Sequence, residues 1–228
     1  MEEEIKMAWV ECFGQLTDVF NPLFSETEIA DNSLLNLEIT FSESWNNFDL
    51  LKINLINNND TTTINSYYVT PGQINFIKTN NYALGLFFDS SASCSYTLGN
   101  NSWTKTNSSS LGNIYKIYGL TATNCSPNEV VVYNDITTPS KTVNYNNGSF
   151  YNFDLIFTLN QQASNTMTPN YTFIIPTNEN KPLYDRNCYF LVYDYSNNDT
   201  GCYITEHQMR IVDLFYANFL YVSGLKYK

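Results

Sequence analysis

The residues that could carry chemistry are few and widely spaced in this chain of 228 residues. His207 is the only histidine, so a Ser-His-Asp triad would have to use it, yet the sequence has no Gly-x-Ser-x-Gly nucleophile elbow. Phosphate-binding loops and His-Glu-x-x-His are also missing from the sequence. A glycosidase needs only two carboxylates, and 22 Asp and Glu residues leave that chemistry open. We expect a non-enzymatic protein without a catalytic, cofactor or metal site, and a surface position for His207 beside Glu206.

Thiols and oxygen-rich turns are the remaining candidate ligands. The five cysteines show no Cys-x-x-Cys spacing, which argues against zinc. Cys188 and Cys202 flank an expected hairpin and could form a disulfide, but buried free thiols are the favoured interpretation. Two polar segments, 57–60 and 196–199, could ligate calcium through oxygen atoms, and we interpret them as turns.

Charge and hydropathy narrow the range of partners. The net charge is −11, and the 11 Lys and Arg residues are scattered, so the chain lacks the basic face that nucleic acid or an anionic membrane would require. No apolar run approaches the roughly 20 residues of a membrane span. The N-terminus, Met-Glu-Glu-Glu, is acidic where a signal peptide is basic. We therefore expect synthesis in a cytoplasm without a signal peptide.

A repeat at a spacing of 105 residues organises the chain. Residues 47–51 read Asn-Phe-Asp-Leu-Leu, and residues 152–156 read Asn-Phe-Asp-Leu-Ile. Because chance rarely supplies several blocks in one order at one spacing, the pattern predicts two copies of one module in tandem. The same offset pairs Pro71 with Pro176, Asp89 with Asp194, Gly119 with Gly224 and Leu120 with Leu225.

The elements expected around these blocks are strands. Aromatic residues make up 16% of the chain and charged residues only 14%, and such a mix with many Asn, Ser and Thr favours strands and turns. Strands are expected at 35–41, 48–56, 64–69, 73–78, 82–89, 93–98 and 114–121, and in the second copy at 142–145, 150–159, 171–175, 188–195, 201–205, 208–214 and 219–225.

The expected architecture is all-β. It consists of two tandem duplicated antiparallel β-sandwich modules, Ig-like or jelly-roll-like, preceded by a short N-terminal amphipathic helix. We place the helix and a polar linker (25–34) in 1–34, the first module at 35–123 and the second at 140–228. The connection at 124–139 is expected to contain a strand at 130–133.

Residues 2–20 are the one helix that the pattern predicts. Its apolar residues step by four and three positions like a heptad seam, and Pro22 should end it. The helix would pack on its own domain, join identical chains with a trimer favoured, or dock into a larger assembly. The seam consists of Ile5, Trp9, Cys12, Leu16 and Val19, followed by Leu23.

The repeated block suggests structural roles for its residues. Phe48 and Leu50 are expected on one face of a strand, with Asp49 on the other. A carboxylate present in both copies most simply accepts hydrogen bonds from a neighbouring loop, with catalysis or a metal as the alternative. The paired prolines are expected where a strand ends.

Together these blocks resemble a β-sandwich module of bacteriophage virion appendage proteins of the tail-fibre, baseplate and head-fibre type. The second copy departs from the pattern at Ser223, where Tyr is usual, and no motif covers the helix. The resemblance implies modules that are often trimeric and act in adhesion or structure without catalysis. The matching stretches are 47–51, 69–71, 82–89 and 115–120, then 152–156, 174–176, 189–195 and 221–226.

The expected function follows from this resemblance. It is a non-enzymatic virion structural protein: a fibre, spike, decoration or tail-appendage component whose partners are other virion proteins. A host-surface glycan is a further candidate partner, because Tyr rings combine an apolar face with a polar handle. The alternatives are a surface or secreted carbohydrate-binding β-sandwich protein and a glycan hydrolase.

Overall fold

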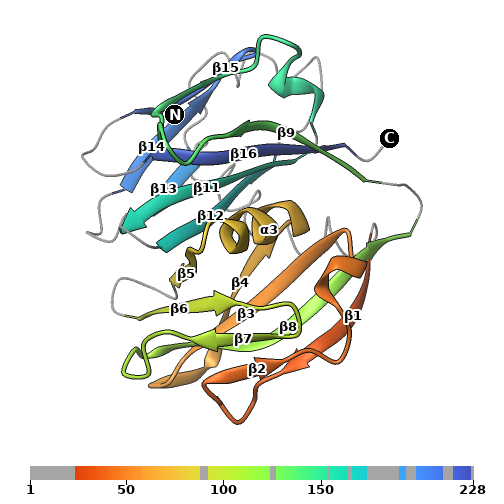
Figure 1. Cartoon of the computed structure of the whole chain (residues 1–228), viewed down its shortest axis with the longest axis vertical. Coiled ribbons are helices and arrows are strands. Elements are labelled where there is room, and N and C mark those ends of the chain that lie inside the picture. The colour runs from red at the N-terminus through yellow and green to blue at the C-terminus, as the bar shows by residue number, and fades with distance from the viewer. Residues whose placement is uncertain are drawn as a thin grey trace, which may run out of the picture.

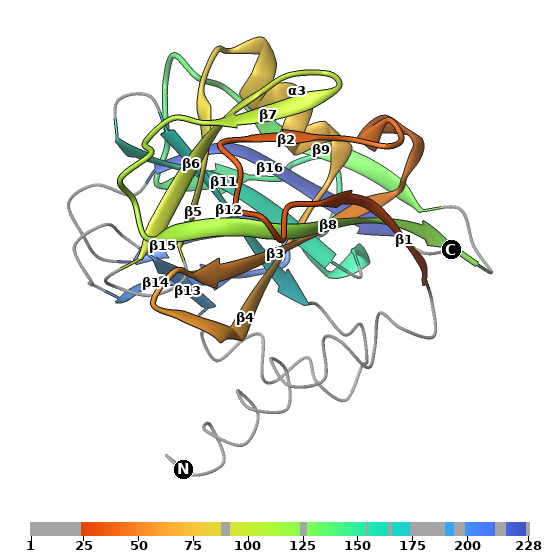
Figure 2. The same cartoon turned by 90° about the horizontal axis from the view of Figure 1, so that it is seen from below.

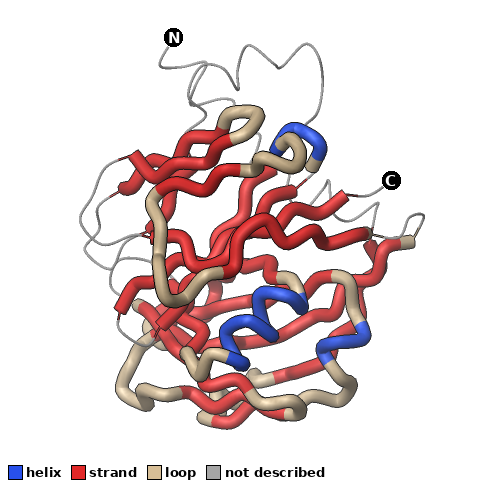
Figure 3. Tube along the Cα trace, turned by 45° about the horizontal axis from the view of Figure 1, so that its top comes forward, coloured by secondary structure: helices blue, strands red, loops and turns tan. Residues whose placement is uncertain are grey.

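Strands make up most of the computed structural model (Figure 3), as expected for an all-β chain. It describes residues 24–87, 92–123, 127–153, 155–163, 166–173, 190–193, 199–212 and 218–226. The expected N-terminal helix, Asp154 and the Cys188 end of the candidate disulfide lie outside these residues. Among the described residues, no helix is long and apolar enough to cross a membrane.

The described residues of the first half form eight strands, one α-helix and a short 3-10 helix, and Figure 1 shows how these elements are arranged. The strands are β1 (Phe24–Asp31), β2 (Glu38–Thr40), β3 (Leu50–Asn57), β4 (Asp60–Val69), β5 (Ala83–Phe87), β6 (Ser93–Leu98), β7 (Ser102–Lys105) and β8 (Gly112–Ala122). The helices are η1 (Trp45–Asn47) and α3 (Pro71–Thr79).

The second half repeats this succession of strands as far as it is described. It contains β9 (Asn128–Asn134), β10 (Thr142–Asn144), η2 (Phe150–Asn152), β11 (Leu155–Ala163), β12 (Thr166–Phe173), β13 (Phe190–Tyr193), β14 (Asp199–Ile204), β15 (Gln208–Val212) and β16 (Asn218–Lys226).

Three sheets connect these strands (Figure 2). One has the order β1-β8-β3-β4, and another has β10-β15-β14-β13. The third has eight strands in the order β2-β7-β6-β5-β12-β11-β16-β9 and therefore contains strands of both halves. The two halves meet in it where β5 runs parallel to β12, with Ala83 opposite Thr166 and Leu84 opposite Met167.

The strand registers of the two halves correspond at the spacing seen in the sequence. Leu50 on β3 pairs with Leu120 on β8, and Leu155 on β11 pairs with Leu225 on β16, so both partners shift by 105 positions. The register slips once in each pair, between Asn54 and Leu55 and between Leu159 and Asn160, again 105 positions apart. The repeated residues thus occupy corresponding places in two pairs of strands.

A close approach between a ring and a backbone explains the repeated Phe and Gly. A Cβ atom on Gly119 would lie 2.3 Å from Cγ of Phe48, and one on Gly224 would lie 2.2 Å from Cγ of Phe153. Only glycine leaves room for each ring. Asp49 Oδ2 accepts a hydrogen bond of 2.8 Å from the backbone N–H of Ala122. The carboxylate thus accepts a backbone hydrogen bond as expected, but the donor is the last residue of β8 rather than a loop residue.

The prediction of a strand at 73–78 is wrong, because these residues belong to helix α3. Thr70 is the N-cap, its hydroxyl accepts from the Gln73 backbone N–H, and the Gln73 side chain accepts from the Thr70 N–H. Pro71 occupies the first turn, where the missing N–H costs nothing. This capping box outweighs the strand propensity of Ile and Phe. Pro71 therefore begins a helix, while Pro176 lies outside the described residues.

The prediction of a polar linker at 25–34 is also wrong. Its first part is β1, which pairs with β8, and the register shifts between Glu28 and Ala30. Such a bulge breaks the alternation by which a strand is recognised in sequence. The strand expected at 35–41 is shorter, since β2 begins at Glu38, and β7 was not expected.

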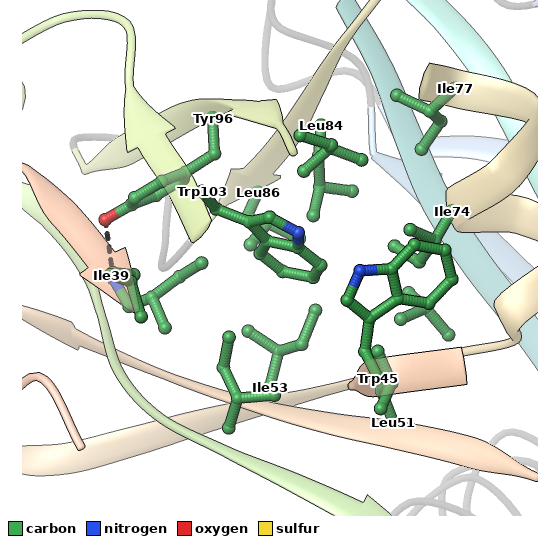
Figure 4. Close-up of a cluster of buried hydrophobic side chains, with 14 of the residues drawn as sticks. Ile39, Trp45, Leu51, Ile53, Ile74, Ile77, Leu84, Leu86, Tyr96 and Trp103 are labelled. Atoms are coloured by element: carbon green, nitrogen blue, oxygen red, sulfur yellow. Dashed lines mark hydrogen bonds between the residues drawn. The ribbon is translucent and has the colours of Figure 1, made fainter. Parts of the chain in front are cut away.

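Phe48 and Leu50 do not share a face, contrary to expectation. Phe48 follows η1 in the chain and packs in the core of the first half, whereas Leu50 packs toward the second half. Strand alternation fails here because Phe48 precedes β3. The core of the first half is centred on Trp45, Trp103 and Ile53 (Figure 4).

A buried apolar layer joins the halves. Leu50, Tyr68 and Leu120 of the first half pack with side chains of the second, and each is at most 2% exposed. Their partners are Leu155, Phe157 and Leu225.

Candidate functional site

Glu129 on β9 forms a polar joint between the halves. Its Oε1 accepts hydrogen bonds from the Thr70 hydroxyl at 2.7 Å, the Tyr221 hydroxyl at 2.8 Å and the Ser223 hydroxyl at 2.7 Å. Thr70 caps α3, so the carboxylate lies at the positive end of this helix, where negative charge is favourable. Hydrogen bonds to a charged acceptor are the stronger kind. We call Glu129, Thr70, Tyr221 and Ser223 the Glu129 joint.

The surroundings of the joint are closely packed. A Cβ atom on Gly72 would lie 2.5 Å from Oε2 of Glu129 and 2.6 Å from the Tyr221 hydroxyl, so glycine allows the carboxylate to reach the helix. Gln73 Nε2 donates to the Thr158 carbonyl oxygen at 2.9 Å, which adds a second bond between the halves. The joint can therefore hold α3 against β9 and β16.

Tyr221 serves as a neutral donor in this joint. Burial raises its pKa well above the ordinary value, and the neighbouring Glu129 charge and its hydrogen bond raise the pKa further. A phenol that keeps its proton donates a hydrogen bond rather than acting as a base.

Sequence reasoning found only part of the joint. Ser223 is the position where the second copy departs from the appendage pattern, and the corresponding residue 105 positions earlier is Tyr118. The smaller Ser side chain donates to Glu129. Thr70 and Gln73 form a capping box that can be recognised in sequence, whereas Glu129 and Tyr221 carry no local signal.

A cavity of about 340 Å³ opens where α3, β5, β6 and β12 meet. We call it the threonine pocket, because three of its wall residues are threonines. The wall includes residues of both halves, because Thr166 is on β12 and the remaining lining residues belong to the first half. Its lining residues are Lys78, Asn81, Tyr82, Ala83, Thr97, Leu98, Thr106 and Thr166.

The C-terminus of α3 positions one wall of this pocket. Asn81 has a left-handed backbone with φ of 57°, and its N–H donates to the Lys78 carbonyl oxygen at 3.1 Å. The Tyr82 N–H donates to the Ile77 carbonyl oxygen at 3.0 Å. This is the Schellman arrangement, in which Asn often takes the left-handed position. It holds the Tyr82 ring partly against the core.

Thr97, Thr106 and Thr166 form another part of the wall. On β6, Ser93, Ser95 and Thr97 alternate with buried residues. Thr97 lies opposite Thr104 on β7, and the exposed Thr106 follows at the end of that strand. The exposed face of this part of the sheet is therefore rich in uncharged hydrogen-bonding groups.

The residues singled out in the sequence lie apart from this pocket. His207 is exposed as expected, with Nδ1 2.8 Å from the Gly148 carbonyl oxygen and Nε2 4.0 Å from Glu206. The segment 57–60 forms the turn between β3 and β4, as expected. The thiol of Cys94 is free, and burial raises its pKa to about 12. Within the described ranges, His, Cys, Asp and Glu side chains do not gather in groups of three or more that could hold a metal.

A buried lysine was not anticipated. Lys105 on β7 donates from Nζ to the Asn113 Oδ1 at 2.7 Å and to the Ser110 carbonyl oxygen at 2.9 Å. Burial lowers its pKa. It holds the loop between β7 and β8.

Protein-family models, curated proteins and solved structures were compared with this chain, and none of the three comparisons found a match.

Proposed function

We propose that the chain is a non-enzymatic structural protein of a phage-like virion, a fibre, spike, decoration or tail-appendage component built from two copies of one β-sandwich module. The observation that carries the proposal is the recurrence of strand order and register at an offset of 105 residues. What recurs is structural, namely the packing of Phe48 on Gly119 and of Phe153 on Gly224. The polar contacts of Glu129 do not recur, because Glu26, which lies opposite Leu120 as Glu129 lies opposite Leu225, pairs with Lys52 instead. This difference favours a duplicated scaffold over a duplicated active site.

In this proposal, each module is a pair of facing sheets. The order β1-β8-β3-β4 corresponds to β9-β16-β11-β12, and β2-β7-β6-β5 corresponds to β10-β15-β14-β13. Each pair of sheets encloses its own apolar cluster, one around Trp45 and Trp103 and one around Phe150 and Phe153.

The second copy has adapted to lie against the first. On β3, Lys52 and Asn54 face away from the core, and on β11 the corresponding residues are Phe157 and Leu159, both fully buried. An outward strand face that is apolar in one copy favours permanent contact. Rigid coupling of this kind suits a protein that transmits mechanical load in an assembly.

The loop before β2 offers a contact surface for another virion protein. Leu34 is 83% exposed and Leu37 is 51% exposed. The Asn32 side chain holds this loop, donating to the Ile114 carbonyl oxygen at 2.9 Å and accepting from the Asn36 N–H at 2.8 Å. In this proposal the two exposed leucines are the candidate contact residues of the loop.

The N-terminal segment is proposed to attach and oligomerise the protein through its heptad seam, with a trimer favoured. Size-exclusion chromatography with light scattering on the full chain tests this. We expect a trimer that Leu16→Ser converts to a monomer, because Leu16 is in the seam. Gln15→Ser, outside the seam, should leave the trimer intact. A wild-type monomer, or equal effects of both substitutions, would contradict the attachment role.

A surface or secreted carbohydrate-binding protein is the second candidate, favoured by the threonine pocket. Such a protein would bind glycans as a monomer. Light scattering in the presence and absence of glycan therefore separates the two candidates.

A further inference from the structure

The threonine pocket has the size and composition of a small-ligand site. Its volume of about 340 Å³ falls in the range of about 300–1,000 Å³ that small-molecule sites occupy. Its wall needs both halves, because Thr166 is on β12 while the other lining residues belong to the first half. The site is therefore complete only when the halves are joined.

The polar groups of the pocket suit a ligand with many hydroxyls. The hydroxyls of Thr97 and Thr166 can each donate and accept a hydrogen bond, and the Asn81 amide can do both. The Thr106 hydroxyl is already hydrogen-bonded to Ser95. Within the part of the chain that the structure describes, the side chains of Thr97 and Thr166 form no hydrogen bond with a neighbouring residue. Their hydroxyls are consequently available to a ligand.

Tyr82 adds an apolar surface to this polar wall. The ring is half-buried, and the Schellman arrangement fixes its backbone. An aromatic face packs well against the C–H groups of a sugar ring, while the phenol remains free to hydrogen-bond. A fixed ring also loses little conformational entropy when a ligand binds.

Electrostatics favour an uncharged ligand. Lys78 is the one charged residue among the described lining residues, and its Nζ already donates to Asn100 Oδ1. The pocket adjoins the C-terminus of α3, where the helix dipole is negative, and the chain has a net charge of −11. Both effects oppose an anionic sugar.

We infer that the threonine pocket binds a neutral saccharide unit, with its ring on Tyr82 and its hydroxyls on Thr97, Thr166 and Asn81. This inference rests on the host-surface contact in the proposed function and names the ligand class for it. Lys78 acts in it as a hydrogen-bond donor rather than as a counter-ion.

A glycan array probed with the full chain tests the inference. The array carries neutral hexose and N-acetylhexosamine oligosaccharides beside oligosaccharides with uronic acids. We expect binding to neutral glycans, and the strongest neutral binder is then titrated by calorimetry. An array without binding, or binding to acidic glycans only, would overturn the inference.

Substitutions locate the binding. Thr97→Val and Thr166→Val keep the shape of the side chain and remove one hydroxyl each, and each should weaken binding about threefold to tenfold, as expected for one hydrogen bond. Tyr82→Ala should weaken it at least as much. Thr40→Val is the matched control, because Thr40 is an exposed residue of the same sheet outside the pocket. If Thr40→Val and Thr97→Val have equal effects, the assignment to this pocket is wrong.

The result is separable from the virion proposal. Leu16→Ser should change the oligomeric state and leave the affinity per chain unchanged. If the wild-type chain is a trimer that binds no glycan, only the saccharide site is overturned. If it binds glycan as a monomer, only the attachment role is overturned.

Discussion

Single substitutions in this protein should affect stability most where side chain and backbone are packed most closely. At Gly119 the ring of Phe48 occupies the place of a side chain. Overpacking a core typically costs about 1–3 kcal/mol, since neighbours must shift to make room. The repeated Phe and Gly of each half therefore depend on each other, because they pack against each other.

We expect Gly119→Ala to lower the free energy of unfolding by about 1–3 kcal/mol. Phe48→Leu should recover part of this loss in the double variant, because a smaller side chain leaves space for the methyl group. Chemical denaturation of both single variants and the double variant gives the coupling. Additive effects would show that the contact between Phe48 and residue 119 does not limit stability.

A second residue-scale prediction concerns Asp60. Hydrogen bonds from Thr62 and Thr63 lower its pKa to about 2. A carboxyl whose folded pKa is depressed stabilises the protein above its unfolded pKa, so this contribution should disappear as the pH falls from about 3.8 toward about 2.

NMR titration of the Asp60 carboxyl carbon measures the shift directly. Thr62→Val should move the pKa upward toward 3.8, because Thr62 supplies the largest share of the lowering. Thr61→Val serves as the neighbouring control and should leave the titration unchanged. An unshifted pKa in Thr62→Val would contradict the assignment of the hydrogen bond.

At the scale of elements, the residues at the two ends of α3 determine that it is a helix, and strands distant in the sequence fix its position. Its capping box and Schellman end are local, whereas its position depends on Glu129 from β9 and on Tyr221 and Ser223 from β16. Three hydroxyl donors on one carboxylate oxygen lose their acceptor together if Glu129 is truncated.

Glu129→Ala should therefore cost about 4 kcal/mol or more of unfolding free energy, since three hydrogen bonds to a charged group, worth about 1.5–3 kcal/mol each, would be lost and their donors left unpaired. Glu129→Gln keeps one oxygen acceptor and should cost less. Glu26 is the matched control, because it lies opposite Leu120 as Glu129 lies opposite Leu225 and pairs at the surface with Lys52.

Glu26→Ala should cost at most about 1 kcal/mol, the usual value of a surface ion pair. Thermal or chemical unfolding of the variants provides the comparison. Equal losses in Glu26→Ala and Glu129→Ala would argue that the Glu129 joint has no special role.

On the scale of the whole molecule, the halves depend on each other through the shared sheet and the buried layer around Leu50, Leu155 and Phe157. The core of the first half even includes Leu159 and Met167 of the second. Unfolding of one half exposes apolar surface on the other, so the two should melt together.

Phe157→Lys introduces a lysine at this junction, as in the first half, where the corresponding residue is Lys52. Burying an unpaired charge and losing a ring should cost about 3–5 kcal/mol. Calorimetry should show the single wild-type transition divide into two, because the halves lose their coupling. Lys52→Ala, at the corresponding position of β3, should retain one transition, and two transitions in wild type would refute the coupling.

The local content of the sequence predicted much of this fold. Alternating residues predicted β6 at 93–98 within its observed bounds, and composition predicted an all-β chain. Helix α3 was missed because strand propensity was weighed above its capping box, and β1 was missed because a bulge hides its alternation. The threonine pocket was out of reach, since its wall joins Lys78 to Thr166 across the two halves.

What the sequence alone determined is therefore the class of fold and the spacing of 105 residues, because the first follows from composition and the second from a repeated pattern. Only the tertiary structure decided that Glu129 meets Thr70 and Ser223, which lie 59 and 94 positions away in the chain. Such partners are brought together by the packing of one half on the other, and no local pattern encodes that contact.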